Sequence, residues 1–176
     1  MRRLILLRHT KSDWPDGIGD HERPLAKRGR RAGLVMGSYI AQKGLLPDIA
    51  IVSTARRTQE TWELVRPAFA SLPVQRNEPR IYEAPVPVLL DVIREVDEAA
   101  HTLLMVGHNP GFQNMALDLI GEADQADIAR LRTKFPTGGL VVVDLQVGSW
   151  AEVAAKCGRL ELFETPRSVA GGYLSN

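Results

Sequence analysis

Short apolar runs alternate with polar loops and amphipathic segments along most of the chain. Residues 4–7 form a run of four apolar residues that ends abruptly in charge, a pattern typical of a strand buried on both faces of a parallel sheet. Residues 48–53 and 102–106 repeat this pattern. Residues 140–145 and 151–163 predict two further strands, the second of them interrupted in its middle, and these two could pair as a hairpin.

Between these runs, apolar residues recur at helical spacing. The spacing predicts helices over residues 25–42, 55–69, 86–97 and 112–120, with a weaker extended segment over 74–82. Gly44 stands where the first helix would end. Strands that alternate with helices imply an α/β fold: a three-layer α/β/α sandwich around a mostly parallel sheet.

Composition narrows the class of protein. The 176 residues fit a single domain over 1–176, and 44% hydrophobic content is ordinary for a globular protein. Lys and Arg total 22 against 21 Asp and Glu, so the chain has no overall field that would attract nucleic acid or an anionic membrane, and any anion site must be local. One cysteine, Cys157, and the absence of a signal-like start lead us to expect a cytoplasmic protein.

Residues suited to phosphate chemistry follow three of the predicted strands. The first strand ends in Arg8-His9, the second in Ser53 followed by Arg56-Arg57, and the third in Gly107-His108-Asn109. Ligands of open α/β sheets bind beyond the carboxyl ends of the strands, so these ends would share one pocket. A neutral imidazole supplies a nucleophilic lone pair, and guanidinium groups grip phosphoryl oxygens through paired hydrogen bonds. We find no zinc-ligand spacing and expect neither a metal nor a cofactor.

This ordered set resembles the histidine phosphatase superfamily, and most strongly its SixA-type phosphohistidine phosphatases, which have a phosphoglycerate mutase-like fold. The segments that carry the resemblance are Leu-Leu-Arg-His-Thr-Lys-Ser-Asp-Trp (6–14), Asp-His-Glu-Arg-Pro-Leu with Arg28-Gly29 following (20–29), Ser-Thr-Ala-Arg-Arg-Thr-Gln-Glu-Thr (53–61), Ile-Tyr-Glu-Ala (81–84), Val-Gly-His-Asn-Pro-Gly (106–111) and Pro-Thr-Gly-Gly (136–139).

The resemblance implies a role for each matching residue. His9 would be the nucleophile that becomes transiently phosphorylated, Arg8 and Arg57 would clamp the phosphoryl group, and His108 would donate a hydrogen bond to it. Asn109 would also face the phosphate. Arg56 remains an alternative to Arg57.

Two roles stay open within that resemblance. Glu83 is the candidate for the acid that protonates the leaving group, with Asp13 as its rival. Thr10 stands where many family members have glycine, and its hydroxyl either contacts a phosphoryl oxygen or faces the loop.

The expected activity is that of a histidine-dependent phosphatase. The stretch between Arg57 and His108 is short for this family, which suggests an open pocket and a phosphohistidine on another protein as the substrate. The alternatives are a phosphomonoesterase or mutase that acts on small phosphate esters, and a module that binds phosphate without catalysis. The sequence leaves the oligomeric state undetermined.

Overall fold

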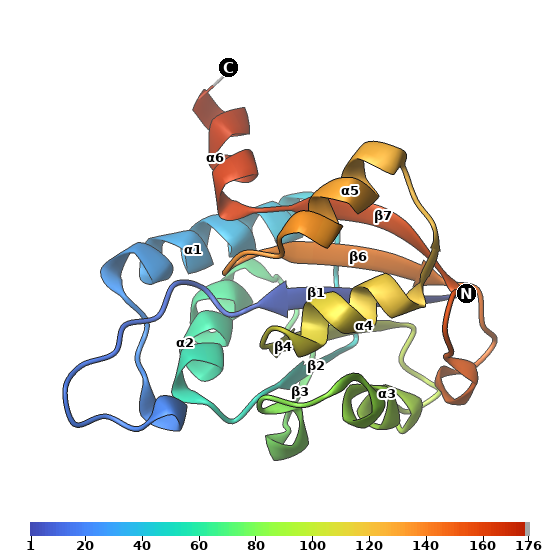
Figure 1. Cartoon of the computed structure of the whole chain (residues 1–176), viewed down its shortest axis with the longest axis horizontal. Helices are drawn as coiled ribbons and strands as arrows, with labels where there is room; N and C mark the ends of the chain where they lie inside the picture. The colour runs from blue at the N-terminus through green and yellow to red at the C-terminus, as the bar shows by residue number, and fades with distance from the viewer. Residues whose placement is uncertain (175–176) are drawn as a thin grey trace.

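A seven-stranded sheet forms the centre of the protein in the computed structural model, which describes residues 1–174 (Figure 1). The strand order is β3-β2-β4-β1-β6-β7-β5. Strand β6 runs antiparallel to β1 and β7, and every other neighbouring pair is parallel. The strands are β1 (Arg2–Arg8), β2 (Ile49–Val52), β3 (Val74–Asn77), β4 (Thr102–Gly107), β5 (Ile120–Glu122), β6 (Leu140–Leu145) and β7 (Gly158–Glu164).

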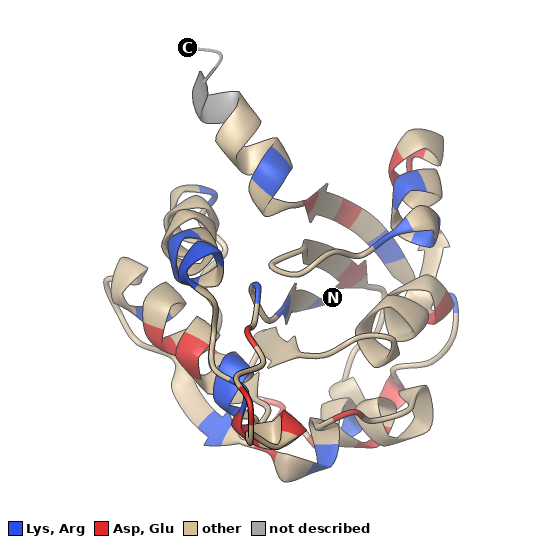
Figure 2. Ribbon diagram, turned by 60° about the vertical axis from the view of Figure 1, so that its left-hand side comes forward, with Lys and Arg blue, Asp and Glu red and all other residues tan. Residues whose placement is uncertain are grey.

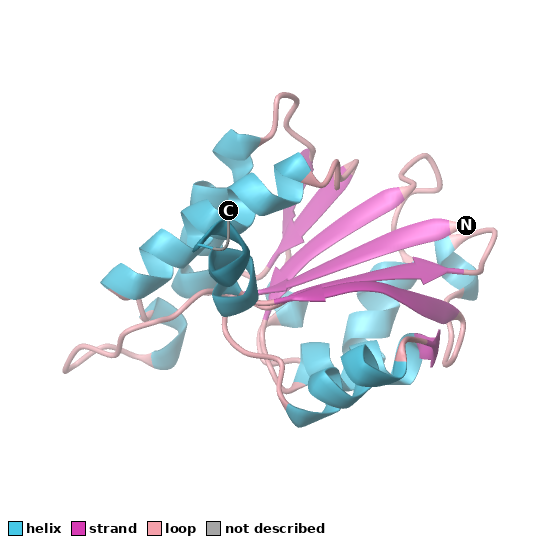
Figure 3. Cartoon of the chain, turned by 90° about the horizontal axis from the view of Figure 1, so that it is seen from above, coloured by secondary structure: helices cyan, strands magenta, loops and turns pink. Residues whose placement is uncertain are grey.

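Helices cover both faces of the sheet, as Figure 3 shows. Alternate residues of β1 enter two separate apolar clusters: Leu4 and Leu6 pack with α3, α4 and α5, whereas Ile5 and Leu7 pack with α1, α2 and α6. The three-layer α/β/α sandwich is thereby confirmed. The helices are α1 (Lys27–Gln42), α2 (Arg56–Val65), α3 (Val86–Arg94), α4 (Gly111–Leu119), α5 (Gln125–Thr133) and α6 (Pro166–Leu174).

The boundaries differ from the expected ones where a local constraint intervenes. The helix expected over 55–69 is α-helical only to Val65, because Pro67 cannot donate to the preceding turn, and a 3-10 turn (Arg66–Ala68) follows. The extended segment 74–82 keeps its strand only to Asn77. The strand expected over 151–163 begins at Gly158, since Lys156 has a φ of +62° and its neighbours form a turn. Strands β6 and β7 do pair as a hairpin.

Charges of both signs are spread over the helices and the sheet, as Figure 2 shows. Across residues 1–174, none of the helices is long and apolar enough to cross a membrane.

The sheet register brings the polar strand ends together. Arg8 of β1 pairs with Gly107 of β4, and the backbone N–H of His9 donates to the Gly107 carbonyl at 3.1 Å. On the other side of β4, the N–H of Ser53 donates to the Val106 carbonyl at 3.0 Å. Because these strands are parallel and in register, their polar continuations leave the sheet at one edge.

Two glycines let other segments approach this edge closely. Gly138, at a φ of +73°, donates its N–H to the carbonyls of Arg8 and His9. Gly29, in the first turn of α1, lies so close to the loop after β1 that a Cβ atom would stand 2.0 Å from the Lys11 carbonyl oxygen. The helix therefore fixes the position of that loop only as long as residue 29 has no side chain.

We predict that Gly29→Ala lowers the free energy of unfolding by about 1–3 kcal/mol, the usual range for an overpacked contact. Chemical denaturation of the purified protein measures the loss. The matched control is Gly19→Ala, in the loop after β1, where an added Cβ meets nothing within 4 Å. Equal stability of the two variants would contradict the close approach.

Candidate active site

A cavity of about 250 Å³ opens where the strand ends converge. Its lining comes from the end of β1, the loop that follows it, the start of α2 and the turns after β3, β4 and α5. Every lining residue is polar or charged: Arg8, His9, Lys11, Ser12, Asp20, Arg23, Arg57, Glu83, His108, Asn109 and Thr137. Four of these residues are Lys or Arg and two are carboxylates, so with neutral histidines the cavity is positive. Its charge is a local feature, since the chain as a whole is nearly neutral.

The imidazole of His9 is buried and is held by a backbone carbonyl. Its Nδ1 lies 2.8 Å from the Thr10 carbonyl oxygen. Because a carbonyl can only accept, the ring proton is on Nδ1 and the lone pair is on Nε2. Burial is the main reason that the pKa of His9 falls to about 3; the charges of Arg8, Arg57 and Arg23 lower it further, and the bond to Thr10 opposes them. The ring is neutral at physiological pH.

His108 stands opposite, with its ring centroid 5.5 Å from that of His9. Burial is the main reason that the pKa of His108 falls to about 3, and electrostatic interactions with His9 and Arg57 lower it further. Its Nε2 lies 2.8 Å from the Ser53 Oγ, which itself accepts from the Ala55 N–H. This arrangement favours donation by the Ser53 hydroxyl to Nε2 and places the ring proton on Nδ1.

Three donors of the cavity have no partner among the described residues. They are Nδ1 of His108 and the Nε atoms of Arg8 and Arg57, all inaccessible to solvent. The other two such nitrogens of residues 1–174 belong to Arg76, outside the cavity. Buried donors without acceptors are costly, and these three belong to residues that line the positive cavity. Burial is the main reason that the pKa of Arg8 is lowered, and the charge of Arg57 lowers it further.

Asp20 is the counter-ion of Arg57 in this structure. Arg57 donates through Nη2 to the Asp20 carboxylate at 3.1 Å and through Nη1 to the Asp20 carbonyl at 2.7 Å. The Tyr82 hydroxyl donates to the same carboxylate. Burial raises the pKa of this carboxyl, but the bond from Tyr82, the charge and bond of Arg57 and the bond from Arg23 outweigh burial and hold the pKa well below its usual range. Asp20 is therefore ionised and has no proton to give.

Arg57 and Glu83 line the cavity, whereas their alternatives, Arg56 and Asp13, do not. Arg57 is buried and lines the cavity, whereas Arg56 is half exposed and pairs with Glu60 at 3.3 Å. Glu83 lines the cavity, with Oε1 at 3.9 Å from Nη2 of Arg57, and Asp13 does not line it.

Thr10 and Asn109 differ in their access to the cavity. The Thr10 hydroxyl is fully buried against Thr61, at 3.3 Å, and does not line the cavity. Asn109 lines it, and its Nδ2 donates to the Phe135 carbonyl at 3.0 Å.

Several lining residues had no role assigned from the sequence. They are Lys11, Ser12, Asp20, Arg23 and Thr137. All lie inside the recognised segments 6–14, 20–29 and 136–139, so position in those segments was the available signal. Among residues 1–174, no group of three or more His, Cys, Asp or Glu side chains is arranged to hold a metal ion.

Comparison with known proteins agrees with this geometry. Residues 4–84 match the model of the histidine phosphatase superfamily, branch 1. An uncharacterised protein of Mycobacterium tuberculosis is 36% identical over 92% of this chain and all of its own length. Two solved structures assigned as the phosphohistidine phosphatase SixA have TM-scores of 0.79. The one from Nakamurella multipartitia is 27% identical over 94% of this chain and 96% of its own, and that from Agrobacterium tumefaciens is 28% identical over 94% and 98%.

We predict that the protein loses stability as the pH falls from about 6.5 toward 3. In the unfolded chain the imidazoles take up protons near pH 6.5, whereas His9 and His108 stay neutral in the fold down to about pH 3. Their contribution is therefore complete above pH 6.5 and declines below it, by up to about 1.4 kcal/mol per pH unit for each histidine. Urea unfolding at pH 7, 6 and 5 measures the slope. His9→Asn should flatten it by one histidine's share, and an unchanged slope would disprove the assigned shift.

Proposed function

The chain belongs to the histidine phosphatase superfamily and is a SixA-type, histidine-dependent phosphatase, and from this premise we propose that His9 attacks phosphorus directly and that the substrate is phosphohistidine in proteins. The observation that carries the proposal is the bond from His9 Nδ1 to the Thr10 carbonyl, which leaves a neutral ring with its lone pair on Nε2. The proposal has three parts: the nucleophile, the clamp and the leaving group.

In the first step the Nε2 lone pair forms a bond to phosphorus while the bond from phosphorus to the leaving group breaks. In the second step a water oxygen attacks the phosphorus held by His9, and the bond from phosphorus to Nε2 breaks. One proton of the water goes to solvent, orthophosphate departs, and the neutral ring is restored. Splitting the reaction in this way replaces one difficult displacement by two easier ones. The Thr10 carbonyl keeps the ring oriented through both steps and stabilises the positive charge that the ring acquires.

Arg8, Arg57 and His108 form the clamp. Their unpartnered donors are fixed before the substrate arrives, so little reorganisation is needed as charge spreads over the phosphoryl oxygens. Asn109 completes the clamp at the rim, held there by its bond to the Phe135 carbonyl.

The substrate class is proposed from the character of the cavity. No apolar side chain lines it, so it offers the organic part of a small substrate no apolar surface. Lys11 and Glu83 are exposed, and the cavity is therefore open to solvent. Such a site suits a phosphoryl group presented on the surface of a larger molecule. The labile phosphorus–nitrogen bond of phosphohistidine also demands less from a general acid than a phosphate ester does.

Glu83 is the proposed acid for leaving groups that need a proton. It lines the cavity and is 59% exposed, so it can exchange protons with solvent, unlike the ionised Asp20.

We predict that His9→Ala lowers the rate of phosphohistidine hydrolysis by roughly a thousandfold or more, because the other imidazole of the cavity, His108, has its Nε2 bonded to Ser53. The wild-type protein should take up an acid-labile label from radioactive substrate within the first turnover, and the variant should not. Retained hydrolysis or labelling in the variant would refute the nucleophile.

Neighbouring arginines provide the matched control for that experiment. Arg57→Ala should reduce turnover about 10²–10³-fold, as expected for loss of one fixed donor at a developing charge. Arg56→Ala, which removes an exposed side chain of the same helix, should stay within about twofold. Equal effects of the two changes would contradict the proposed clamp.

We predict that Glu83→Gln affects substrates according to their leaving groups. Hydrolysis of glycerol phosphate, whose alkoxide needs a proton, should fall by about 10²-fold or more. Hydrolysis of p-nitrophenyl phosphate, whose leaving group departs as an anion, should change little. Steady-state rates on the two esters measure this, with Asp13→Asn as the control. A uniform loss on both esters would rule out proton donation by Glu83.

A further inference from the structure

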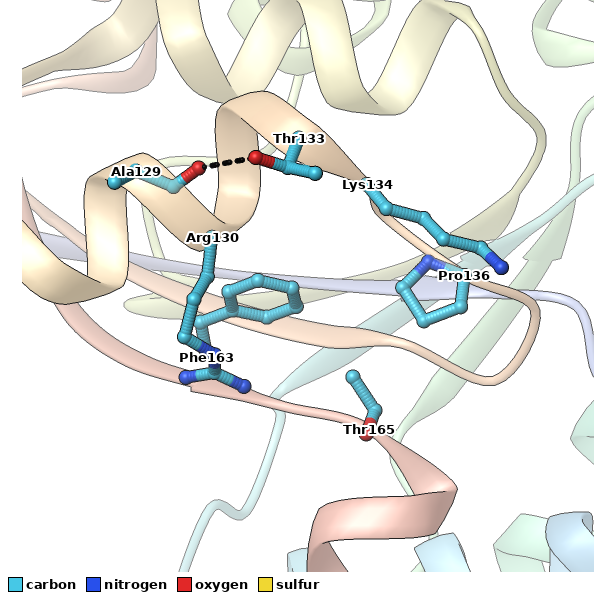
Figure 4. A pocket seen from close by; sticks show the side chains of 7 residues that line it. All are labelled: Ala129, Arg130, Thr133, Lys134, Pro136, Phe163 and Thr165. Carbon is cyan, nitrogen blue, oxygen red and sulfur yellow. Dashed lines mark hydrogen bonds between the residues drawn. The ribbon is translucent and has the colours of Figure 1, made fainter.

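A second and larger pocket lies beside the catalytic cavity, between α5 and β7 (Figure 4). Its volume is about 420 Å³, and we name it the α5–β7 groove. The residues that matter for its chemistry are Ala129, Arg130, Thr133, Lys134, Pro136 and Phe163. Its lining is mainly apolar, in contrast to the wholly polar lining of the catalytic cavity.

Consecutive residues of one segment line the groove and the cavity. Pro136 lines the groove and Thr137 lines the cavity. The carbonyl of the preceding residue, Phe135, accepts from Arg8 at 3.0 Å and from Asn109 at 3.0 Å. The segment between the two pockets is thus bonded to the phosphate clamp, and the groove has a fixed position relative to the phosphoryl group.

The charges of the groove have one sign. The Arg130 guanidinium lies 4.8 Å from the Phe163 ring centroid and pairs with Asp127. Lys134 is exposed, and within residues 1–174 its ammonium has no hydrogen-bond or ion-pair partner. In Figure 4 Lys134 stands with Pro136 at one end of the groove, and Arg130 with Phe163 at the other. No carboxylate lines the groove, so its complement is an apolar group with acidic neighbours.

We propose that the α5–β7 groove binds the polypeptide that flanks the phosphohistidine of the substrate protein, with an apolar side chain against Pro136 and Phe163 and an acidic side chain at Lys134. This proposal rests on the proposed function, because it names how a protein substrate is recognised. An extended chain advances about 3.3 Å per residue, so residues a few positions from the phosphohistidine reach the groove. Occupying both pockets with one molecule raises the effective concentration of the phosphoryl group at the cavity.

The experiment compares substrates that share a leaving group and differ in what flanks it. Phosphoimidazole occupies the cavity alone. A phosphohistidine peptide of about ten residues, with leucine and glutamates beside the phosphohistidine, can occupy the groove as well, and a second peptide carries lysines in place of the glutamates. We expect the wild-type protein to have a higher kcat/KM for the acidic peptide than for either other substrate, with an advantage that shrinks as salt is added.

Two variants test the groove itself. Lys134→Glu should lower kcat/KM for the acidic peptide by roughly 3–10-fold, mainly through KM, since it exchanges attraction for repulsion at an exposed site. It should leave phosphoimidazole hydrolysis unchanged. Ala129→Trp, at an exposed helix position, should fill the groove and remove the preference for the acidic peptide over phosphoimidazole.

The control is Arg132→Glu, which makes the same change of charge two residues before Lys134. Arg132 lies in α5 and lines a different pocket. It should leave the acidic-peptide preference intact. If Lys134→Glu and Arg132→Glu have equal effects, or if wild-type protein hydrolyses phosphoimidazole and the two phosphohistidine peptides alike, the groove is not a docking site, although the proposed function stands. If wild-type protein hydrolyses glycerol phosphate but none of the three compounds, the proposed function itself fails.

Discussion

The parallel, in-register pairing of β1 with β4 is the constraint on which the site depends. Pairing of Arg8 with Gly107 places His9 and His108 one residue beyond the same sheet edge, on neighbouring strands. Both strands are buried and apolar up to that point, so a slip of register would move apolar residues out of the two clusters. The energy that fixes the core therefore also fixes the distance between the two imidazoles.

Much of this arrangement was predictable from the sequence, because apolar runs and strand-end motifs carry strong signals. The sheet strands β1, β2, β4 and β6 and the convergence of His9 with His108 all follow from such runs. Helix α5 was missed because only Ile128 and Leu131 are buried in it, too few to show helical periodicity; its clearest signal was Asp124, whose carboxylate caps the helix by accepting from two backbone N–H groups. The end of β7 nearest the turn was misjudged because the left-handed backbone at Lys156 has no signature in that residue type.

Which of two candidate side chains lines the cavity was less predictable, because it depends on the direction in which each side chain points and not on its position in the chain. Arg56 and Arg57 are adjacent in sequence, yet the helix turns one to solvent and the other into the cavity. Likewise, only the paths of their two loops show that Glu83 lines the cavity and Asp13 does not. The counter-ion Asp20 could not be assigned in advance, since its role follows from contacts with Arg57 and Tyr82 that come from distant segments.

The contact between Asp20 and Arg57 has a consequence for the end of the catalytic cycle. An anion that enters the cavity must share Arg57 with a carboxylate of the protein that is already bonded to it and is itself held by Tyr82. In the proposed reaction, orthophosphate formed in the last step would meet the same competitor. Asp20 would take back Arg57 as the product leaves, so the positive cavity would hold orthophosphate less tightly than its arginines alone imply.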